Sequence, residues 1–240
     1  SQYGGLAAMA GISLGGNGGD NKIEHATELL DSWPFLDSFV NKYDFKPKFM
    51  AIENWNKESN SFYYNESIYD EKSDTWASKN GDSKEPSSFE TFSEVRKSIS
   101  FTVSKENGLI TLSVNHYSPI FAKKVVELLT EEINLYFKTL DQHDATKSIE
   151  ILKSKVHETN NSSMQKVFYN MIEGHSKTLL LTEVSSQYLV KTVVPPMVPE
   201  KKHGPKRLLI CVLAMIVGVF LGVMSVLIKH FVKSPGRLTT

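Results

Sequence analysis

A long amphipathic stretch begins at Ser118-Pro-Ile-Phe-Ala-Lys-Lys-Val-Val-Glu-Leu-Leu-Thr130 and continues to about Thr159. Serine is a favoured N-cap residue, and proline is pre-organised for the first position of a helix. Apolar residues then recur mostly at spacings of three and four, which predicts an amphipathic helix. They are Ala122, Val125, Val126, Leu129, Ile133, Tyr136, Phe137, Leu140, Ala145, Ile149, Leu152 and Val156. At about 1.5 Å per residue, this helix is roughly 60 Å long.

A second amphipathic stretch follows Asn160-Asn-Ser-Ser163, which interrupts the first. Its apolar side carries Met164, Val167, Phe168, Met171, Ile172, His175 and Leu179. The two stretches together predict a helical hairpin. A helix this long cannot be wholly covered by a domain of about 200 residues, so we expect part of its stripe to pack on neighbouring copies of the chain.

Shorter elements are predicted before the long helix. Residues 22–40 have helical character, and Trp33-Pro34 interrupts them because proline removes a donor and restricts the preceding residue. Residues 99–103 and 109–114 alternate apolar and polar side chains, which predicts a β-hairpin with Asn107-Gly108 in its turn. The expected fold class is therefore α+β, with a small β-sheet and a very long helix in a helical hairpin.

The segment that follows the helical hairpin leads to an apolar run. A last strand is predicted at 187–194, and Pro195-Pro-Met-Val-Pro199 must be extended. Residues 208–228 contain no charge and one side-chain hydroxyl, that of Ser225, and cations flank both ends. These 21 positions form a helix of roughly 32 Å, which matches a hydrocarbon core of about 30 Å. We therefore predict a transmembrane helix at 208–228.

Composition and motifs indicate a protein that is not an enzyme. The formal net charge is zero, so bulk electrostatics give no reason to expect nucleic acid as a partner. Cys211 is the single cysteine and lies in the apolar run, which excludes an intrachain disulfide and a cysteine-based metal site. The seven histidines are dispersed, and no catalytic motif is present. No catalytic, cofactor-binding or metal-binding residue is predicted.

The stretch 53–90 is rich in polar residues and aromatic rings. The rings belong to Trp55, Phe62, Tyr63, Tyr64, Tyr69 and Trp76, among others. One interpretation is a meandering connection whose aromatic side chains pack onto the domain. The other is a carbohydrate-binding surface, because aromatic faces stack on sugars.

Several segments, in their order and spacing, resemble the Wzz-type chain-length determinants, which are class 1 polysaccharide co-polymerases of bacterial inner membranes. They are Gln2-Tyr-Gly-Gly-Leu-Ala-Ala-Met-Ala-Gly-Ile-Ser13, Ser118-Pro-Ile-Phe-Ala122, Pro195-Pro-Met-Val-Pro199 and Gly204-Pro-Lys-Arg-Leu-Leu209. The resemblance covers nearly the whole chain. It implies a ring of protomers that sets the modal length of a lipid-linked polysaccharide made by the polymerase.

The resemblance also implies a division of the chain. Residues 1–194 would be a periplasmic domain that is truncated at its N-terminus and lacks the first transmembrane helix and a strand. Residues 195–207 would be a proline-rich membrane-proximal segment, 208–228 the transmembrane helix, and 229–240 a short cytoplasmic tail. The implied location is the bacterial inner membrane, with the bulk of the chain in the periplasm. Implied partners are further copies in a homo-oligomeric ring, the polysaccharide polymerase, the lipid-linked glycan and the membrane.

Two small sets of residues are the candidate site residues. Pro195, Pro196, Pro199 and Pro205 would hold the domain at a fixed distance from the bilayer, or would only prevent a helix from continuing. Gly218 and Gly222 have the spacing that allows close contact with another membrane helix.

Two other functions remain open. One is a co-polymerase that partners a tyrosine kinase in capsule or exopolysaccharide export. The other is a membrane-anchored sensor or adhesin domain that binds sugar through the aromatic residues between Trp55 and Trp76.

Overall fold

The computed structural model of the 240-residue chain describes residues 18–79, 82–104, 106, 108–199 and 207–233. The chain divides into two compact units, Ser1–Val198 and Pro199–Thr240. The division falls inside the predicted proline-rich segment 195–207. Each unit is described by itself below.

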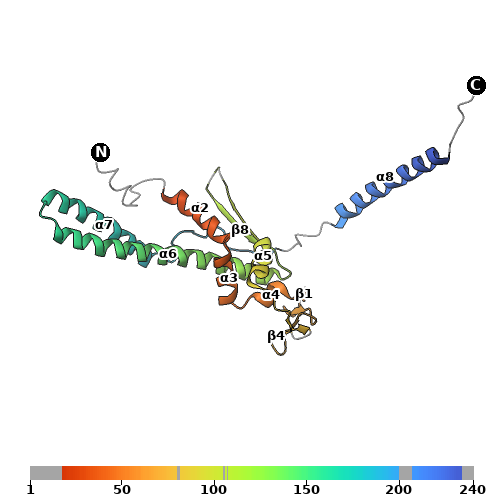
Figure 1. Ribbon diagram of the computed structural model, residues 1–240, viewed down its shortest axis with the longest axis horizontal. Helices are drawn as coiled ribbons and strands as arrows, with labels where there is room; N and C mark the ends of the chain where they lie inside the picture. The colour runs from red at the N-terminus through yellow and green to blue at the C-terminus, as the bar shows by residue number, and fades with distance from the viewer. Residues whose placement is uncertain (1–17, 80–81, 105, 107, 200–206, 234–240) are drawn as a thin grey trace, which may run out of the picture. The chain divides into compact units, whose positions relative to one another are not determined.

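The longest element of the first unit is α6, Pro119–Glu158, a helix of 40 residues (Figure 1). Its predicted start is confirmed, because the Ser118 hydroxyl accepts a hydrogen bond of 3.2 Å from the Phe121 N–H and Pro119 is the first helical residue. At the other end, the Gln165 side-chain amide donates to the carbonyl oxygens of Val156 and Thr159, at 3.3 and 2.9 Å. Both ends of α6 are therefore capped by side chains.

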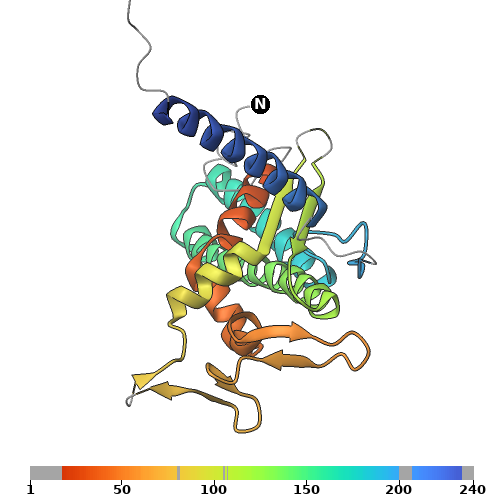
Figure 2. The same ribbon diagram turned by 90° about the vertical axis from the view of Figure 1, so that its right-hand side faces the viewer.

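The apolar stripe of α6 packs against two different partners. Its first half lies in the main core with α2, Gly18–Leu30; α3, Trp33–Lys42; α4, Lys46–Met50; and α5, Ser88–Ser98 (Figures 1 and 2). That core includes Leu30, Leu36, Val40, Phe45, Val95, Ile99, Phe121, Val125, Leu129, Ile133 and Phe137. The second half pairs with α7, Ser162–Val184, which returns alongside it (Figure 1). Here the buried residues of α6 are Ala145, Ile149, Leu152 and Val156.

The interruption predicted at Trp33-Pro34 lies just before these two residues, because α2 ends at Leu30 and α3 begins at Trp33. Ser32 is the N-cap of α3, and Pro34 lies in the first turn. Backbone N–H groups there have no acceptor within the helix, so proline costs no hydrogen bond at this position. Residues 22–40 therefore form parts of two helices, and both contribute apolar side chains to the core.

The described strands form four two-stranded antiparallel sheets. The predicted hairpin is confirmed as β7, Ile99–Val103, and β8, Ile110–Val114, in a register that pairs Ile99 with Val114 and Val103 with Ile110. Gly108, with φ of 66°, adopts the left-handed conformation that glycine tolerates at the turn. The fold is thus a mixed one of helices and small sheets built around a long helix, as expected.

Three shorter hairpins occupy the aromatic-rich stretch. They are β1, Ile52–Trp55, with β2, Phe62–Tyr64; β3, Tyr69–Asp70, with β4, Thr75–Trp76; and β5, Ser78–Lys79, with β6, Asp82–Ser83. Tyr69 is buried, with ring centroids 5.3 Å from Tyr64 and 5.1 Å from Trp76. The rings of Tyr64 and Trp76 both pack on the ring of Tyr69, as the interpretation of this stretch as a packed connection requires.

The prediction of a strand at residues 187–194 is wrong. These residues form neither helix nor strand. Alternation of apolar and polar residues predicted the strand, but the backbone groups of Leu189 and Val190 bond to the side chain of Asn134 instead of to another strand. A buried amide on α6 therefore takes the place of a strand partner.

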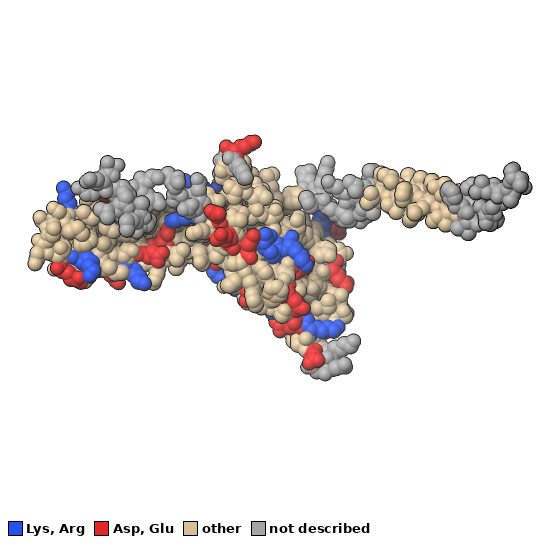
Figure 3. Space-filling model, turned by 45° about the horizontal axis from the view of Figure 1, so that its top comes forward, with Lys and Arg blue, Asp and Glu red and all other residues tan. Residues whose placement is uncertain are grey.

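The second unit contains α8, Arg207–Lys233. Within the described residues, its segment Cys211–Lys229 is the one helical stretch long and apolar enough to cross a membrane. This agrees with the predicted span at 208–228, apart from the exact ends. Figure 3 shows the middle of α8 as a surface without Lys, Arg, Asp or Glu, whereas both signs of charge are interspersed over the first unit.

Candidate functional site

Asn134 holds the segment that leaves α7. Its side chain is 5% exposed, and its Oδ1 accepts hydrogen bonds from the N–H groups of Leu189 and Val190, at 2.7 and 3.0 Å. Its Nδ2 donates to the carbonyl oxygens of Val190 and Thr130, at 3.1 and 3.0 Å. The amide thus uses two acceptor and two donor positions, so its full hydrogen-bonding capacity is satisfied inside the protein.

Asp141 lies seven residues further along α6 and fixes the same segment. Its carboxylate accepts hydrogen bonds from the Tyr188 hydroxyl and from the Lys22 ammonium of α2. The Lys22 nitrogen also lies 5.7 Å from the centroid of the Tyr188 ring. Burial, together with the hydrogen bond to Asp141, raises the pKa of the Tyr188 hydroxyl well above its ordinary value. Tyr188 therefore stays protonated and remains a donor.

Glu132 holds the end of α3 in a similar way. One carboxylate oxygen accepts hydrogen bonds of 2.6 Å from both the Lys42 ammonium and the Tyr43 hydroxyl. The hydrogen bond to Glu132 and, secondly, burial raise the pKa of Tyr43 to about 12. Glu132, Asn134 and Asp141 therefore attach three segments, α2, the end of α3 and residues 188–190, to the middle of α6. We refer to the residues Glu132, Asn134 and Asp141 as the α6 clasps.

Replacing Asn134 with leucine is expected to lower the free energy of unfolding by about 1–3 kcal/mol, because the N–H groups of the half-buried Leu189 and Val190 lose their acceptor. Chemical denaturation of the whole chain in detergent micelles measures this loss. Hydrogen exchange should quicken at Leu189 and Val190 while the amides of β7 and β8 stay protected. A matched change at Glu150, an exposed residue of α6, to leucine should leave both measurements unchanged. Unaltered hydrogen exchange at the amides of Leu189 and Val190 would contradict the role of Asn134 in holding this segment.

His116 joins α4 to the start of α6. Its Nδ1 accepts a hydrogen bond of 3.1 Å from the Ser118 N–H, so Nε2 carries the proton and donates to the Lys48 carbonyl oxygen at 2.9 Å. The rings of Phe49, Phe62 and Phe121 surround it, with the Phe121 centroid at 4.5 Å. Burial lowers the pKa of His116 below its ordinary value, because the charged imidazolium loses solvation.

The free energy of unfolding is expected to decrease as the pH is lowered, because of His116. Since the folded state has the lower pKa, the unfolded chain binds more protons below about pH 6.5, and the free energy of unfolding decreases there by up to about 1.4 kcal/mol per pH unit. Above that pH this contribution is constant. Denaturation curves of the wild type and of His116→Gln from pH 8 to 5 test this. His175, whose pKa is also lowered by burial, contributes equally to both proteins. Parallel pH profiles would show that His116 has no such role.

The hairpin of α6 and α7 exposes many apolar side chains. No residue of α7 except Thr182 is buried, although the whole helix is described. Its predicted apolar side is only half-buried at Val167, Phe168, Met171, Ile172, His175 and Leu179. Leu180 and Leu181 are each 59% exposed, and Ile151 of α6 is 53% exposed. One partner helix is therefore not enough to cover the apolar surface that these two helices present.

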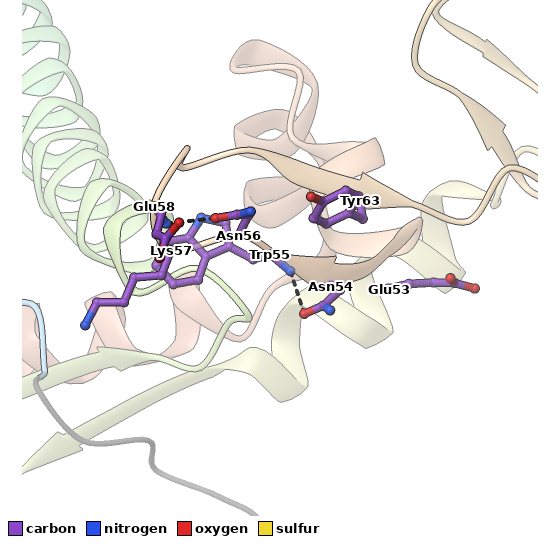
Figure 4. A pocket seen from close by; sticks show the side chains of 7 residues that line it. All are labelled: Glu53, Asn54, Trp55, Asn56, Lys57, Glu58 and Tyr63. Atoms are coloured by element: carbon purple, nitrogen blue, oxygen red, sulfur yellow. Dashed lines mark hydrogen bonds between the residues drawn. The ribbon is translucent and has the colours of Figure 1, made fainter.

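A shallow hollow of about 770 Å³ lies on the hairpin of β1 and β2 (Figure 4). It is lined by Glu53, Asn54, Trp55, Asn56, Lys57, Glu58 and Tyr63. The hairpin contacts the start of α6 through Phe62, whose ring centroid lies 6.0 Å from that of Phe121. Phe62 thus attaches the hairpin to the core while the residues around the hollow remain accessible.

The predicted proline and glycine residues are not brought together with these features. Pro195, Pro196 and Pro199 lie in a stretch without helix or strand, and Pro205 lies outside the described residues. Gly218 and Gly222 of α8 have no described heavy atom within 4 Å of where a Cβ would stand, so their packing role stays a prediction. Within the described ranges, no group of three His, Cys, Asp or Glu side chains is placed to hold a metal ion.

Sequence reasoning missed the α6 clasps. Asn134 and Asp141 are seven residues apart, which places them on one face of a helix two turns apart. Asn134 also sits between Ile133 and Phe137, both buried. A polar residue on an apolar face was the available signal, but its partners at 188–190 cannot be identified from spacing.

A scan of the chain against protein-family models finds no match, and a search of curated proteins finds none either.

Proposed function

We propose that this chain is a protomer of an oligomeric inner-membrane scaffold that regulates the modal chain length of lipopolysaccharide O-antigen or a related surface polysaccharide. In this proposal α8 spans the bacterial inner membrane and the first unit lies in the periplasm. The proposal rests on the order and spacing of the segments that resemble Wzz-type proteins. It also draws support from the long helix α6 and from the apolar length of Cys211–Lys229.

The structural observation that supports an oligomeric scaffold is the incomplete burial of the α6–α7 hairpin. A helix of 40 residues, about 60 Å long, presents apolar residues along its whole length. The main core covers its first half, whereas the second half packs on α7, in which Thr182 alone is buried and the apolar side is half-buried. Further copies of the chain would cover the exposed residues of this hairpin, and a symmetric assembly provides the same cover to every copy.

The mechanism that follows is structural. A ring of long helices would restrain the growing glycan or organise the polymerase, and no bond would be made or broken by this chain. The extended stretch with Pro195, Pro196 and Pro199 suits a spacer between the first unit and α8, because proline prevents helix and holds the backbone extended. Close contact through Gly218 and Gly222 would join α8 to another membrane helix.

Deleting the gene tests the function. The expected result is loss of the modal band of surface polysaccharide on a gel while synthesis continues, because the polymerase would work without length control. Plasmid-borne wild type should restore the band. A ladder that is unchanged by the deletion would overturn the proposal, and complete loss of polysaccharide would point to a role in synthesis instead.

The assembly is tested by replacing Leu180 and Leu181 together with serine, which removes apolar area from the exposed side of α7. We expect the mass of the detergent-solubilised chain, measured by light scattering, to fall from that of an oligomer toward that of one protomer, and the modal band to broaden. Lys166→Ser, an exposed position on the same helix, is the matched control and should change neither. A wild-type chain that is monomeric at all concentrations would contradict the assembly.

A further inference from the structure

The stretch 193–198, beyond the α6 clasps, carries apolar side chains that the fold leaves exposed. Val193 and Val194 are each 72% exposed, and Met197 is 78% exposed. A few residues earlier in the chain, the side chain of Leu189 packs against the main core. The described part of the first unit therefore covers the chain as it leaves α7 and then leaves the next apolar side chains largely uncovered.

The backbone of the same stretch is also without internal partners. Within the described ranges, no hydrogen bond joins residues 193–199 to another residue. Just before them, the Thr192 N–H donates to the Gln187 side-chain oxygen at 3.0 Å. Proline has no N–H, so Pro195 and Pro196 could not take part in the ladder of a regular strand. Pairing of this stretch with a sheet edge of another chain is therefore disfavoured.

The next residues of the chain lead to the apolar helix of the second unit. Residues 199–206 separate the stretch from Arg207, the first residue of α8. Even fully extended, they span at most about 30 Å. In sequence they contain three lysines and one glutamate, and cations beside a membrane helix are attracted to anionic headgroups. If α8 crosses a bilayer, this tether keeps the stretch within reach of the lipid surface.

We propose that residues 193–198 bind the lipid surface at which α8 enters the bilayer. The side chains of Val193, Val194 and Met197 lie at the boundary between headgroups and acyl chains, about 5–10 Å deep. Their apolar area is thereby removed from water. The headgroup region contains water, so the backbone keeps hydrogen-bond partners that the hydrocarbon core would not offer. The inference rests on α8 crossing a bilayer, which is part of the proposed function.

Lipid suits this stretch better than the alternatives do. A spacer in water needs no apolar side chains, because polar residues beside proline also give an extended chain. A second copy of the chain would have to offer a groove shaped for an extended, proline-rich segment, whereas the exposed apolar residues of α6 and α7 lie on helical faces. The boundary between headgroups and acyl chains requires no complementary shape.

The test measures depth in the membrane with nitroxide labels on the full chain, reconstituted in nanodiscs of phosphatidylcholine and phosphatidylglycerol. Cys211→Ala removes the single native cysteine, and Met197→Cys then introduces a labelling site. Electron paramagnetic resonance gives the collision rates of the label with oxygen, which concentrates in lipid, and with a water-soluble nickel chelate. The ratio of oxygen to nickel collisions should be several-fold higher at Met197→Cys than at Val184→Cys, on an apolar residue of α7 that is 82% exposed.

Two pairs of substitutions in the Met197→Cys chain test what holds the stretch at the lipid. Val193→Ser with Val194→Ser should lower the ratio toward the Val184→Cys value, because the apolar side chains that bind lipid are lost. The matched control removes apolar side chains from α7, by Leu180→Ser and Leu181→Ser, and should leave the ratio unchanged. An unchanged ratio after the two valine substitutions would overturn the inference.

A label at Phe220→Cys, in the middle of α8, separates this inference from the proposed function. The expected ratio there is the highest of all. Equal ratios at Met197→Cys and Val184→Cys, with a high ratio at Phe220→Cys, would overturn the inference alone. Low collision rates with both oxygen and nickel at Met197→Cys would assign the stretch to a protein partner and also overturn it. A low ratio at Phe220→Cys would show that α8 does not cross the bilayer, which refutes the proposed function as well.

Discussion

The apolar stripe of α6 must be buried, and the rest of the first unit is arranged around that requirement. A helix of 40 residues is longer than the core that α2 to α5 can build, so the stripe is divided between two partners. Leu129 and Ile133 lie in the main core, whereas Ile149 and Leu152 depend on α7. Burial of apolar area supplies the main driving force, and α7 supplies less of it than the core does.

Polar residues in the middle of α6 determine what is attached there. Glu132, Asn134 and Asp141 bind the end of α3, residues 188–190 and α2, and each satisfies groups that would be costly to leave without partners. Tyr43 and Tyr188 remain donors because their pKa values are raised. The α6 clasps therefore fix the course of the chain after α7. In the proposed function, the chain continues from there to the membrane helix.

The elements governed by local chemistry were predictable. Ser118 and Pro119 start α6, Asn160 and Asn161 separate it from α7, and alternation identified β7 and β8. The prediction of a strand at residues 187–194 failed for a physical reason. Alternation of apolar and polar residues indicates a strand only if another strand is available to pair with it. The candidate site followed the same division, because Tyr63 was recognised as an aromatic residue but not as one that stays exposed while Tyr69 and Trp76 pack on each other.

By itself, the sequence determined the elements of this protein: a long helix with a defined start, a return helix, a hairpin and an apolar run long enough for a membrane. Periodicity, capping residues and hydrophobic length are properties of neighbouring residues, so they can be read along the chain. Only the tertiary structure decided that Asn134 replaces a strand partner, that Asp141 joins Lys22 to Tyr188, and that the α6–α7 hairpin stays incompletely covered. Those features depend on which distant surfaces meet, and residue spacing does not encode that.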